Sequence, residues 1–305
     1  MRRLIRLALP VALTVFATPA ATQPPGVSIP MPGETATAHY ARLQPALGSN
    51  IVATTNVAYG PDARHRLDVF SSARTRAELV PIVLFVHGGG YVGGNKATPG
   101  TPFYQSVGAF WVRSGMVGVN VTYRLAPQHA WPSGAADLGE ALKWVRENAE
   151  AYGGDPDRIV LMGHSAGASH VATYIFNETL QPAGGDDGVV GAILMSGWYD
   201  PATAARAGTT RAYFGDDESR YAARAARPRA AGRTIPVFIG VAEHDPPGYH
   251  VEAEGLFNAL CARDLRCPRM KRLAGHDHMT SIFHLGTSDL SLSADLIDFV
   301  RSLDH

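Results

Sequence analysis

The sequence predicts an α/β fold, in which a mostly parallel sheet is covered by helices on both faces. Short apolar runs alternate with segments of helix length along most of the chain, which is the pattern of strands buried on both sides. The composition, 46% hydrophobic and 18% charged over 305 residues, is that of a globular chain with a full core. Glycine-rich motifs directly follow two of the apolar runs, at the edge of the sheet where α/β enzymes place their sites.

The expected elements follow one another along the chain. Residues 50–59 and 66–70 are rich in β-forming residues and flank a turn, which predicts an antiparallel pair. Ala141, Trp144 and Val145 share one helical face. Residues 200–233, rich in Ala and Arg, interrupt the alternation and predict a small helical lid over the carboxyl edge of the sheet. Buried strands are expected at 82–86, 116–122, 159–162, 190–195 and 235–241, a further strand at 269–273, and helices at 103–114, 135–152 and 166–177.

The first residues predict an export signal. Three arginines at positions 2, 3 and 6 precede an apolar stretch of about ten residues and a small-residue exit at 17–21. The stretch is shorter than the span of about 20 apolar residues that a membrane helix needs, so no stable membrane anchor is expected after cleavage. We therefore expect a signal peptide over 1–22, an irregular Pro-rich arm over 23–50, one α/β domain over 51–305, and a secreted or periplasmic protein.

The two cysteines, Cys261 and Cys267, lie six positions apart. An oxidising compartment permits a disulfide between them. Such a bridge would close a short loop between a helix end and a strand, and would stabilise the fold by roughly 2 kcal/mol. The alternative is a pair of unlinked thiols.

Charge and motif content exclude several classes of function. The chain has 27 basic and 27 acidic residues, so it lacks the positive field that nucleic-acid binding requires. The sequence contains no metal-ligand spacing such as His-Glu-x-x-His, and two thiols cannot form a four-ligand zinc site alone. We expect no cofactor, no metal and no nucleic-acid partner.

A Gly-His-Ser-Ala-Gly motif occupies residues 163–167, between an expected strand and an expected helix. This is the context of a nucleophile elbow, in which a strained turn presents a serine hydroxyl at the top of the sheet. The motif predicts that Ser165 is a catalytic nucleophile.

A His-Gly-Gly-Gly-Tyr motif at 87–91 follows another expected strand. A glycine run lets backbone N–H groups turn toward a developing oxyanion. A phosphate loop or a flexible turn is the alternative, but the Lys-Ser/Thr pair and the G-x-G-x-x-G pattern of such loops are absent. We expect the N–H groups of Gly89, Gly90 and Ala166 to form an oxyanion hole.

Further motifs carry a family resemblance. They are Tyr-Arg-Leu-Ala-Pro-Gln-His-Ala-Trp-Pro at 123–132, Trp-Val-Arg-Glu-Asn at 144–148 and Gly-Gly-Asp-Pro-Asp-Arg-Ile at 153–159. With the two motifs above, residues 55–300 resemble the hormone-sensitive-lipase-like carboxylesterases of the α/β-hydrolase fold. The chain lacks their long N-terminal helical cap and has His164 where that branch often has Asp. In both respects it is similar to feruloyl-esterase-like and arylformamidase-like relatives.

The resemblance implies a triad in the order Ser, acid, His. Asp245, followed by Pro after an expected strand, matches the family position of the acid, with Glu243 as the rival. The family spacing Gly-x-x-His places the base at His278; His276 is then a loop residue and Asp277 a solvated or capping carboxylate.

Four further side chains are candidates for lining the substrate pocket: Tyr91, His164, Trp198 and His276. The two aromatic residues could equally pack in the core, and a packing or hydrogen-bonding role is the more common one for a histidine at position 164. The predicted function is a serine carboxylesterase that hydrolyses short-chain or aromatic esters through an acyl-enzyme intermediate. An arylformamidase-like amide hydrolase, or a feruloyl or acetyl carbohydrate esterase, on the same triad is the alternative. A non-catalytic binding module is disfavoured, because nucleophile, acid, base and oxyanion loop all occur in order.

Overall fold

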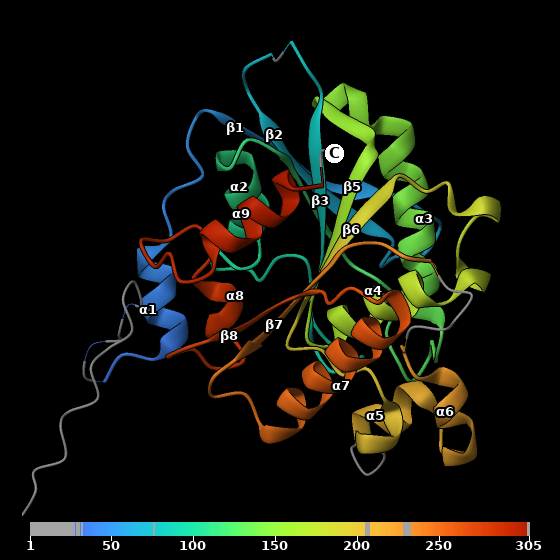
Figure 1. Ribbon diagram of the computed structural model, residues 1–305. Helices are drawn as coiled ribbons and strands as arrows, with labels where there is room; N and C mark the ends of the chain where they lie inside the picture. The colour runs from blue at the N-terminus through green and yellow to red at the C-terminus, as the bar shows by residue number, and fades with distance from the viewer. Residues whose placement is uncertain are drawn as a thin grey trace, which may run out of the picture.

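A computed structural model describes residues 28, 31, 33–75, 77–204, 208–227 and 233–303. The expected signal peptide lies outside the described residues. Within them, eight strands form one sheet in the order β1-β2-β4-β3-β5-β6-β7-β8 (Figure 1). The strands are β1 Ile51–Ala58, β2 Arg66–Ser72, β3 Val80–Val86, β4 Val117–Val121, β5 Gly154–His164, β6 Val189–Met195, β7 Val237–Ala242 and β8 Arg269–Leu273.

The sheet is mostly parallel, as predicted. Strands β4, β3, β5, β6, β7 and β8 pair in parallel, while β1 pairs with β2 and β2 with β4 in antiparallel fashion. Because neighbouring parallel strands end at the same edge, the segments that follow β3, β5, β6, β7 and β8 gather there. These segments contain every expected catalytic residue.

Helices cover both faces of the sheet. Helices α3, α4 and α7 pack on one face, and α2, α9 and the short α1 and α8 pack on the other (Figure 1). The bounds are α1 Ala36–Leu43, α2 Gln105–Arg113, α3 Ser133–Asn148, α4 Ala166–Phe176, α5 Gly208–Phe214, α6 Tyr221–Arg224, α7 Pro247–Asp264, α8 Thr280–Phe283 and α9 Ser293–Arg301.

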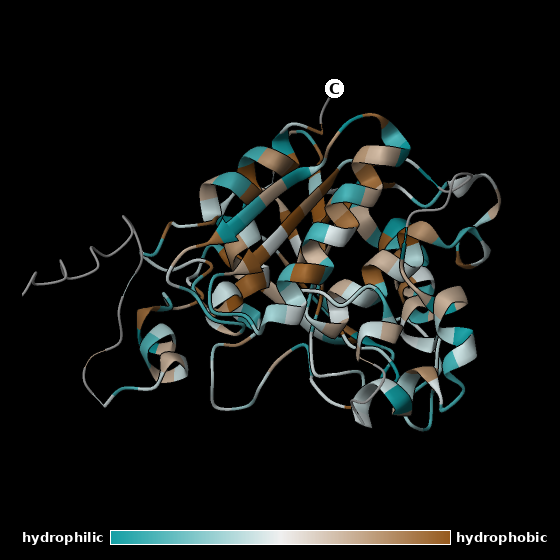
Figure 2. Ribbon diagram, turned by 60° about the horizontal axis from the view of Figure 1, so that its bottom comes forward, coloured by the Kyte–Doolittle hydropathy of each residue, from teal (hydrophilic) through white to brown (hydrophobic). Residues whose placement is uncertain are grey.

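The alternation of side chains along the central strands builds two cores. In β3, Ile82 and Leu84 pack under α3 and α4, whereas Val83 and Phe85 pack under α2 and α9. This is the period of two expected of a strand buried on both faces. In Figure 2 several strands are brown and apolar, an outer strand is teal, and the surrounding helices are teal on parts of their surface.

Two segments differ from the sequence-based expectation. The arm over 23–50, expected to be irregular, contains helix α1, whose N-terminus is capped by the Thr35 side chain. Its Tyr40 is buried in the core, so tertiary packing stabilises a helix that local sequence does not signal. The expected helix over 135–152 changes to a 3₁₀ turn, Ala149–Tyr152, after α3 ends.

The described parts of 200–233 form the expected helical lid. They contain the 3₁₀ turns Pro201–Ala204 and Glu218–Arg220 and the short helices α5 and α6. Tyr213 and Phe214 of α5 and Tyr221 of α6 pack with Tyr91 and Ala166 in an apolar cluster separate from the two main cores. The lid is therefore anchored to the glycine-rich loop and to the start of α4.

Cys261 and Cys267 form a disulfide, as predicted, with sulfur atoms 2.10 Å apart. The bridge links the end of α7 to the segment that precedes β8. Among the described residues, no helix has the length and apolar character required to cross a membrane.

Candidate active site

Ser165 occupies the sharp turn between β5 and α4. Its φ of 57° and ψ of −124° lie outside the regions that residues with a side chain normally adopt. Glycines on both sides make the turn possible. A Cβ on Gly163 would lie 2.5 Å from the backbone of Ala168, and one on Gly167 would lie 2.1 Å from the Val86 carbonyl oxygen. The motif therefore forms the strand, turn and helix arrangement of a nucleophile elbow.

Asp245 and His278 form a hydrogen-bonded pair at the same edge of the sheet. His278 Nδ1 lies 2.6 Å from Asp245 Oδ1. The other carboxylate oxygen accepts hydrogen bonds from the Ser196 hydroxyl at 2.6 Å and the Ala242 N–H at 2.8 Å. Burial raises the pKa of Asp245, but the hydrogen bonds from His278 and Ser196 hold it below its ordinary value. The ionised carboxylate orients the imidazole with Nδ1 protonated and Nε2 as the basic nitrogen.

The rival carboxylates have other partners. Glu243 accepts a hydrogen bond from the Gly275 N–H at 2.7 Å and pairs with Arg272 at 3.3 Å, so it braces the loop before His278. Asp277 accepts hydrogen bonds from two N–H groups of the turn that begins α8. The geometry thus pairs His278 with Asp245, and Asp277 is a capping carboxylate.

Tyr249 interacts with both the Ser165 side chain and the His278 imidazole. Burial raises the pKa of its phenol, and hydrogen bonding with the Ser165 side chain opposes that rise. The ring centroid of Tyr249 is 4.7 Å from that of His278. Because one side chain contacts both groups, Ser165 and His278 lie next to the same phenol.

The glycine-rich loop lies directly against the elbow. A Cβ on Gly88 would come within 2.9 Å of the Ser165 Cβ. Gly89 and Gly90 have φ values of 126° and 59°, which residues with a Cβ rarely adopt. Ala166 is the first residue of α4, where helical N–H groups have no partner in the helix. Within the described chain, the N–H groups of Gly89, Gly90 and Ala166 donate to no protein acceptor.

Two buried histidines hold the backbone of the site. His87 Nδ1 lies 2.6 Å from the Gly88 carbonyl oxygen, and its ring stacks on Tyr123. His164 Nε2 lies 2.8 Å from the carbonyl oxygen of His278. Burial lowers the pKa of both histidines to about 3, so each is neutral at pH 7 and donates one N–H to its carbonyl. His164 is buried and positions the segment that carries His278.

The aromatic candidates for the pocket occupy two different places. Tyr91 is buried, stacks on Tyr213 of the lid and donates a hydrogen bond to Ser169 Oγ at 3.1 Å. Trp198 is half-buried, and its ring centroid is 5.0 Å from that of Tyr249. Trp198 therefore lies beside Tyr249 and near the candidate triad, whereas Tyr91 joins the lid to α4.

His276 does not lie in an open pocket, contrary to its expected place. Its side chain is completely buried, with Nε2 2.9 Å from Ser291 Oγ. The ring packs against His284 and Tyr40 instead. The reason is that residues 276 and 278 are separated by two positions in a turn, so their side chains enter different surroundings.

Ser196 and Tyr249 were not found by sequence reasoning. Ser196 directly follows β6 at the carboxyl edge, which is a usable signal once the strand order is known. Tyr249 lies in the first turn of α7, four residues after Asp245. Its direction toward Ser165 depends on how α7 packs, which no local pattern reveals.

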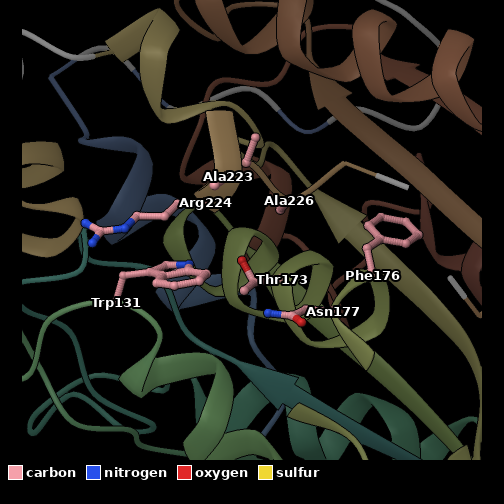
Figure 3. A pocket seen from close by; sticks show the side chains of 8 residues that line it. Trp131, Thr173, Phe176, Asn177, Ala223, Arg224 and Ala226 are labelled. Atoms are coloured by element: carbon pink, nitrogen blue, oxygen red, sulfur yellow. The ribbon is translucent and has the colours of Figure 1, made fainter. Parts of the chain in front are cut away.

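A small cavity lies under the lid, along the second half of α4 (Figure 3). Trp131, Thr173 and Phe176 surround it, and the Arg224 guanidinium lies 5.4 Å from the Trp131 ring centroid. Its volume of about 10 Å³ is enough for one water molecule at most. The cavity begins about 12 Å along the helix from Ser165, so it is not the substrate site.

Comparison with known proteins gives consistent results. Residues 67–179 match the BD-FAE family model. Esterase LipC of Mycobacterium tuberculosis is 34% identical over 160 residues, which cover 50% of this chain and 39% of LipC. Carboxylesterase NlhH of the same organism is 43% identical over 91 residues, which cover 30% of this chain and 27% of NlhH. The chain therefore spans well under half of the length of either relative.

The structural likeness covers more of the chain. The structure of esterase B from Lactobacillus rhamnosis superposes with a TM-score of 0.71 at 16% identity, over 84% of this chain and 88% of that one. The fold is the α/β-hydrolase fold, as the sequence predicted. The similarity to esterases that the motifs predicted is found in these comparisons, over part of the chain in sequence.

Proposed function

We propose that this protein is a serine carboxylesterase acting on short-chain or aromatic esters. The observation that carries the proposal is the Asp245–His278 pair, 2.6 Å apart, at the edge of the sheet where the strained turn after β5 presents Ser165. An elbow serine, a carboxylate-oriented imidazole and a glycine loop are the parts that acyl transfer requires. The esterase names of the similar proteins support this reaction class.

The first half of the reaction forms an acyl-enzyme. His278 Nε2 takes the proton of the Ser165 hydroxyl as Oγ bonds to the ester carbonyl carbon. The N–H groups of Gly89, Gly90 and Ala166 stabilise the oxyanion. His278 then gives the proton to the leaving alkoxide oxygen, and the carbon–oxygen bond of the ester breaks.

The second half releases the acid. Water attacks the acyl carbon while His278 takes its proton, and the tetrahedral intermediate uses the same N–H groups. The bond from Ser165 Oγ then breaks as His278 returns the proton to Oγ. The sequence of steps needs no cofactor.

The lid supports the preference for small substrates. Its short helices α5 and α6 are held in place by the aromatic cluster of Tyr91, Tyr213 and Tyr221. A lid fixed by buried aromatic side chains does not easily open for a long acyl chain. The half-buried Trp198 beside Tyr249 offers a flat surface for an aromatic group.

The test is a panel of p-nitrophenyl esters from C2 to C16, with feruloyl esters alongside. We expect kcat/KM to be highest for C2–C4 or aromatic acyl groups and to fall for C16. Faster turnover of the C16 ester than of the C4 ester would contradict the size preference. A matched ester and amide pair in the same assay tests the alternative of an amide hydrolase, which requires the amide to be the better substrate.

We also propose that the protein is exported to the periplasm or the medium. The arginines and apolar stretch at the N-terminus support export, and the Cys261–Cys267 disulfide is compatible with an oxidising compartment. Cell fractionation followed by mass measurement of the mature chain tests this. Intact protein confined to the cytoplasm would contradict it.

A further inference from the structure

A buried cluster of His276, His284 and Asp289 lies apart from the proposed triad. Each side chain offers one ligand atom, and the three atoms lie within 4.8 Å of one another. All three side chains have zero exposed surface. Two imidazoles and a carboxylate form a donor set that zinc accepts. The same set with open positions is typical of non-haem iron, whereas closed, buried surroundings are typical of structural zinc.

The hydrogen bonds of His284 leave one of its nitrogens without a partner. Its Nδ1 lies 2.7 Å from the Thr280 carbonyl oxygen. A carbonyl only accepts, so Nδ1 carries the proton and Nε2 carries a bare lone pair. That Nε2 is buried and has no hydrogen-bond partner. A lone pair removed from water without a partner costs free energy. In a histidine that binds a metal, one ring nitrogen likewise donates its N–H to a carbonyl while the other nitrogen faces the ion.

His276 and Asp289 stand at the separation that two ligands of one ion need. His276 Nε2 lies 3.5 Å from Asp289 Oδ2. Two ligands with bonds of about 2 Å on a tetrahedral ion are roughly 3.3 Å apart. The other nitrogen of His276, Nδ1, is buried without a partner, so neither tautomer of this ring is fully satisfied by protein groups.

The carboxylate of Asp289 is already oriented. Its Oδ2 accepts hydrogen bonds from the Tyr40 hydroxyl at 2.9 Å and the Ser28 N–H at 3.1 Å. Its Oδ1 accepts one from the Ser291 N–H at 3.1 Å. Hydrogen bonds of this kind hold a ligating carboxylate in place.

We propose that His276, His284 and Asp289 bind one zinc ion with a structural role. Ligand atoms on a tetrahedral zinc ion lie about 3.3 Å apart, so binding would draw the atoms of the cluster, now up to 4.8 Å apart, together by as much as about 1.5 Å. The fourth position is left for water or for Ser291 Oγ, which is 2.9 Å from His276 Nε2.

The position of the cluster explains what the ion would stabilise. Asp289 holds Ser28 and Tyr40 of the N-terminal arm, and His276 precedes His278 by two residues. A zinc ion at this position links three segments: the N-terminal arm with Ser28 and Tyr40, the loop that carries His278, and the segment after α8. The role is independent of the ester chemistry, so its test does not depend on activity.

The test uses the full-length protein, dialysed against a chelator and then titrated with zinc chloride. We expect one zinc ion per chain to survive desalting. At a hundredfold excess over its dissociation constant, zinc should raise the midpoint of thermal unfolding by about 5 °C. Cobalt(II) in place of zinc should give the visible absorption of a four-coordinate ion.

His284→Asn is the sharpest variant, because the amide nitrogen of Asn can replace Nδ1 toward Thr280 while the ligand nitrogen is removed. We expect it to lose the bound zinc and the thermal shift. Asp289→Asn keeps the shape of the side chain and one acceptor oxygen but removes the charge, and serves as the second variant should the first fail to fold. His39→Gln is the matched control, since His39 is equally buried beside Tyr40 and belongs to no ligand set.

The proposal is overturned if the parent protein, mixed with one equivalent of zinc, retains none of it after desalting. It is equally overturned if His284→Asn and Asp289→Asn bind zinc as the parent does, because the ion would then lie elsewhere. Loss of zinc from the two cluster variants, with retention by His39→Gln, supports the site.

Discussion

His278 Nδ1 lies 2.6 Å from Asp245 Oδ1, and the opposite carboxylate oxygen is held by Ser196 and by the Ala242 N–H. The acid is thus fixed on one side by β6 and β7 and presents its other oxygen to the imidazole. This arrangement sets the tautomer of His278, so changes at Asp245 should act on rate without moving the loop.

Asp245→Asn should reduce kcat at pH 7 by about 10⁴-fold, because an amide N–H facing Nδ1 stabilises the wrong tautomer of His278. The shape of the side chain is retained, so the unfolding midpoint should change little. Steady-state kinetics with a butyrate ester measures the loss. A decrease of less than tenfold would show that Asp245 is not the acid.

Ser196→Ala removes one hydrogen bond from Asp245 but leaves the bond to His278. We expect a loss of kcat of about tenfold, the equivalent of one hydrogen bond to a charged group. The measurement is kcat as a function of pH. A less stabilised carboxylate should also shift the acidic limb of this profile to higher pH. An unchanged profile would contradict the positioning role of Ser196.

Tyr249→Phe keeps the ring beside His278 and removes the hydroxyl next to Ser165. We expect kcat/KM for a short ester to fall about tenfold, since one hydrogen bond at the nucleophile is lost. Tyr249→Leu should lose more, because the ring contact with His278 is lost as well. Equal activity of parent and Tyr249→Phe would show that the phenol oxygen has no part in positioning Ser165.

His278→Ala should lower the rate of ester hydrolysis, whereas His276→Ala should mainly lower the stability of the fold. The first should lose as much rate as Ser165→Ala, because triad members act as one unit, and the double variant should be hardly slower than either. The second removes a completely buried ring, so its main effect should be on the unfolding midpoint. The reverse pattern would mean that His276 is the base.

The fold should be sensitive to mild acid. Burial lowers the pKa of His87, His164 and His170 to about 3, whereas unfolding restores a value near 6.5. The unfolded chain therefore binds more protons below about pH 6.5, and stability falls as pH decreases from there toward 3.

The change in the free energy of unfolding with pH follows from the difference in bound protons between the folded and unfolded chain. Each of the three histidines removes about 1.4 kcal/mol from the free energy of unfolding for each pH unit between about 6 and 4. Urea unfolding at pH 7, 6 and 5 measures it, and His170→Asn should reduce the slope, because one neutral buried histidine is removed. A free energy of unfolding that is constant over this range would contradict neutral buried histidines.

The sheet and the elbow were predictable because their signals are local. Apolar runs identify the parallel strands, and the glycines around Ser165 are required by a turn that tolerates no Cβ. The disulfide was one of two alternatives, favoured by the expected export and by the short loop between Cys261 and Cys267.

The parts that were missed depend on contacts between distant segments. Tyr40 of the arm donates a hydrogen bond to Asp289, 249 positions later in the chain, and this contact accompanies helix α1 and the burial of His276. Tyr249 reaches Ser165 only because α7 packs against the sheet beside β7. No local periodicity contains that information.

The role of Ser165 as nucleophile is the central claim, and covalent labelling tests it most directly. A short-chain alkyl phosphonate ester that transfers its phosphonyl group to an activated serine should add once to the parent protein. Peptide mass spectrometry should place the group on Ser165, with complete loss of ester hydrolysis, and Ser165→Ala should be neither labelled nor active. Labelling at another residue, or hydrolysis by Ser165→Ala within tenfold of the parent, would contradict the account.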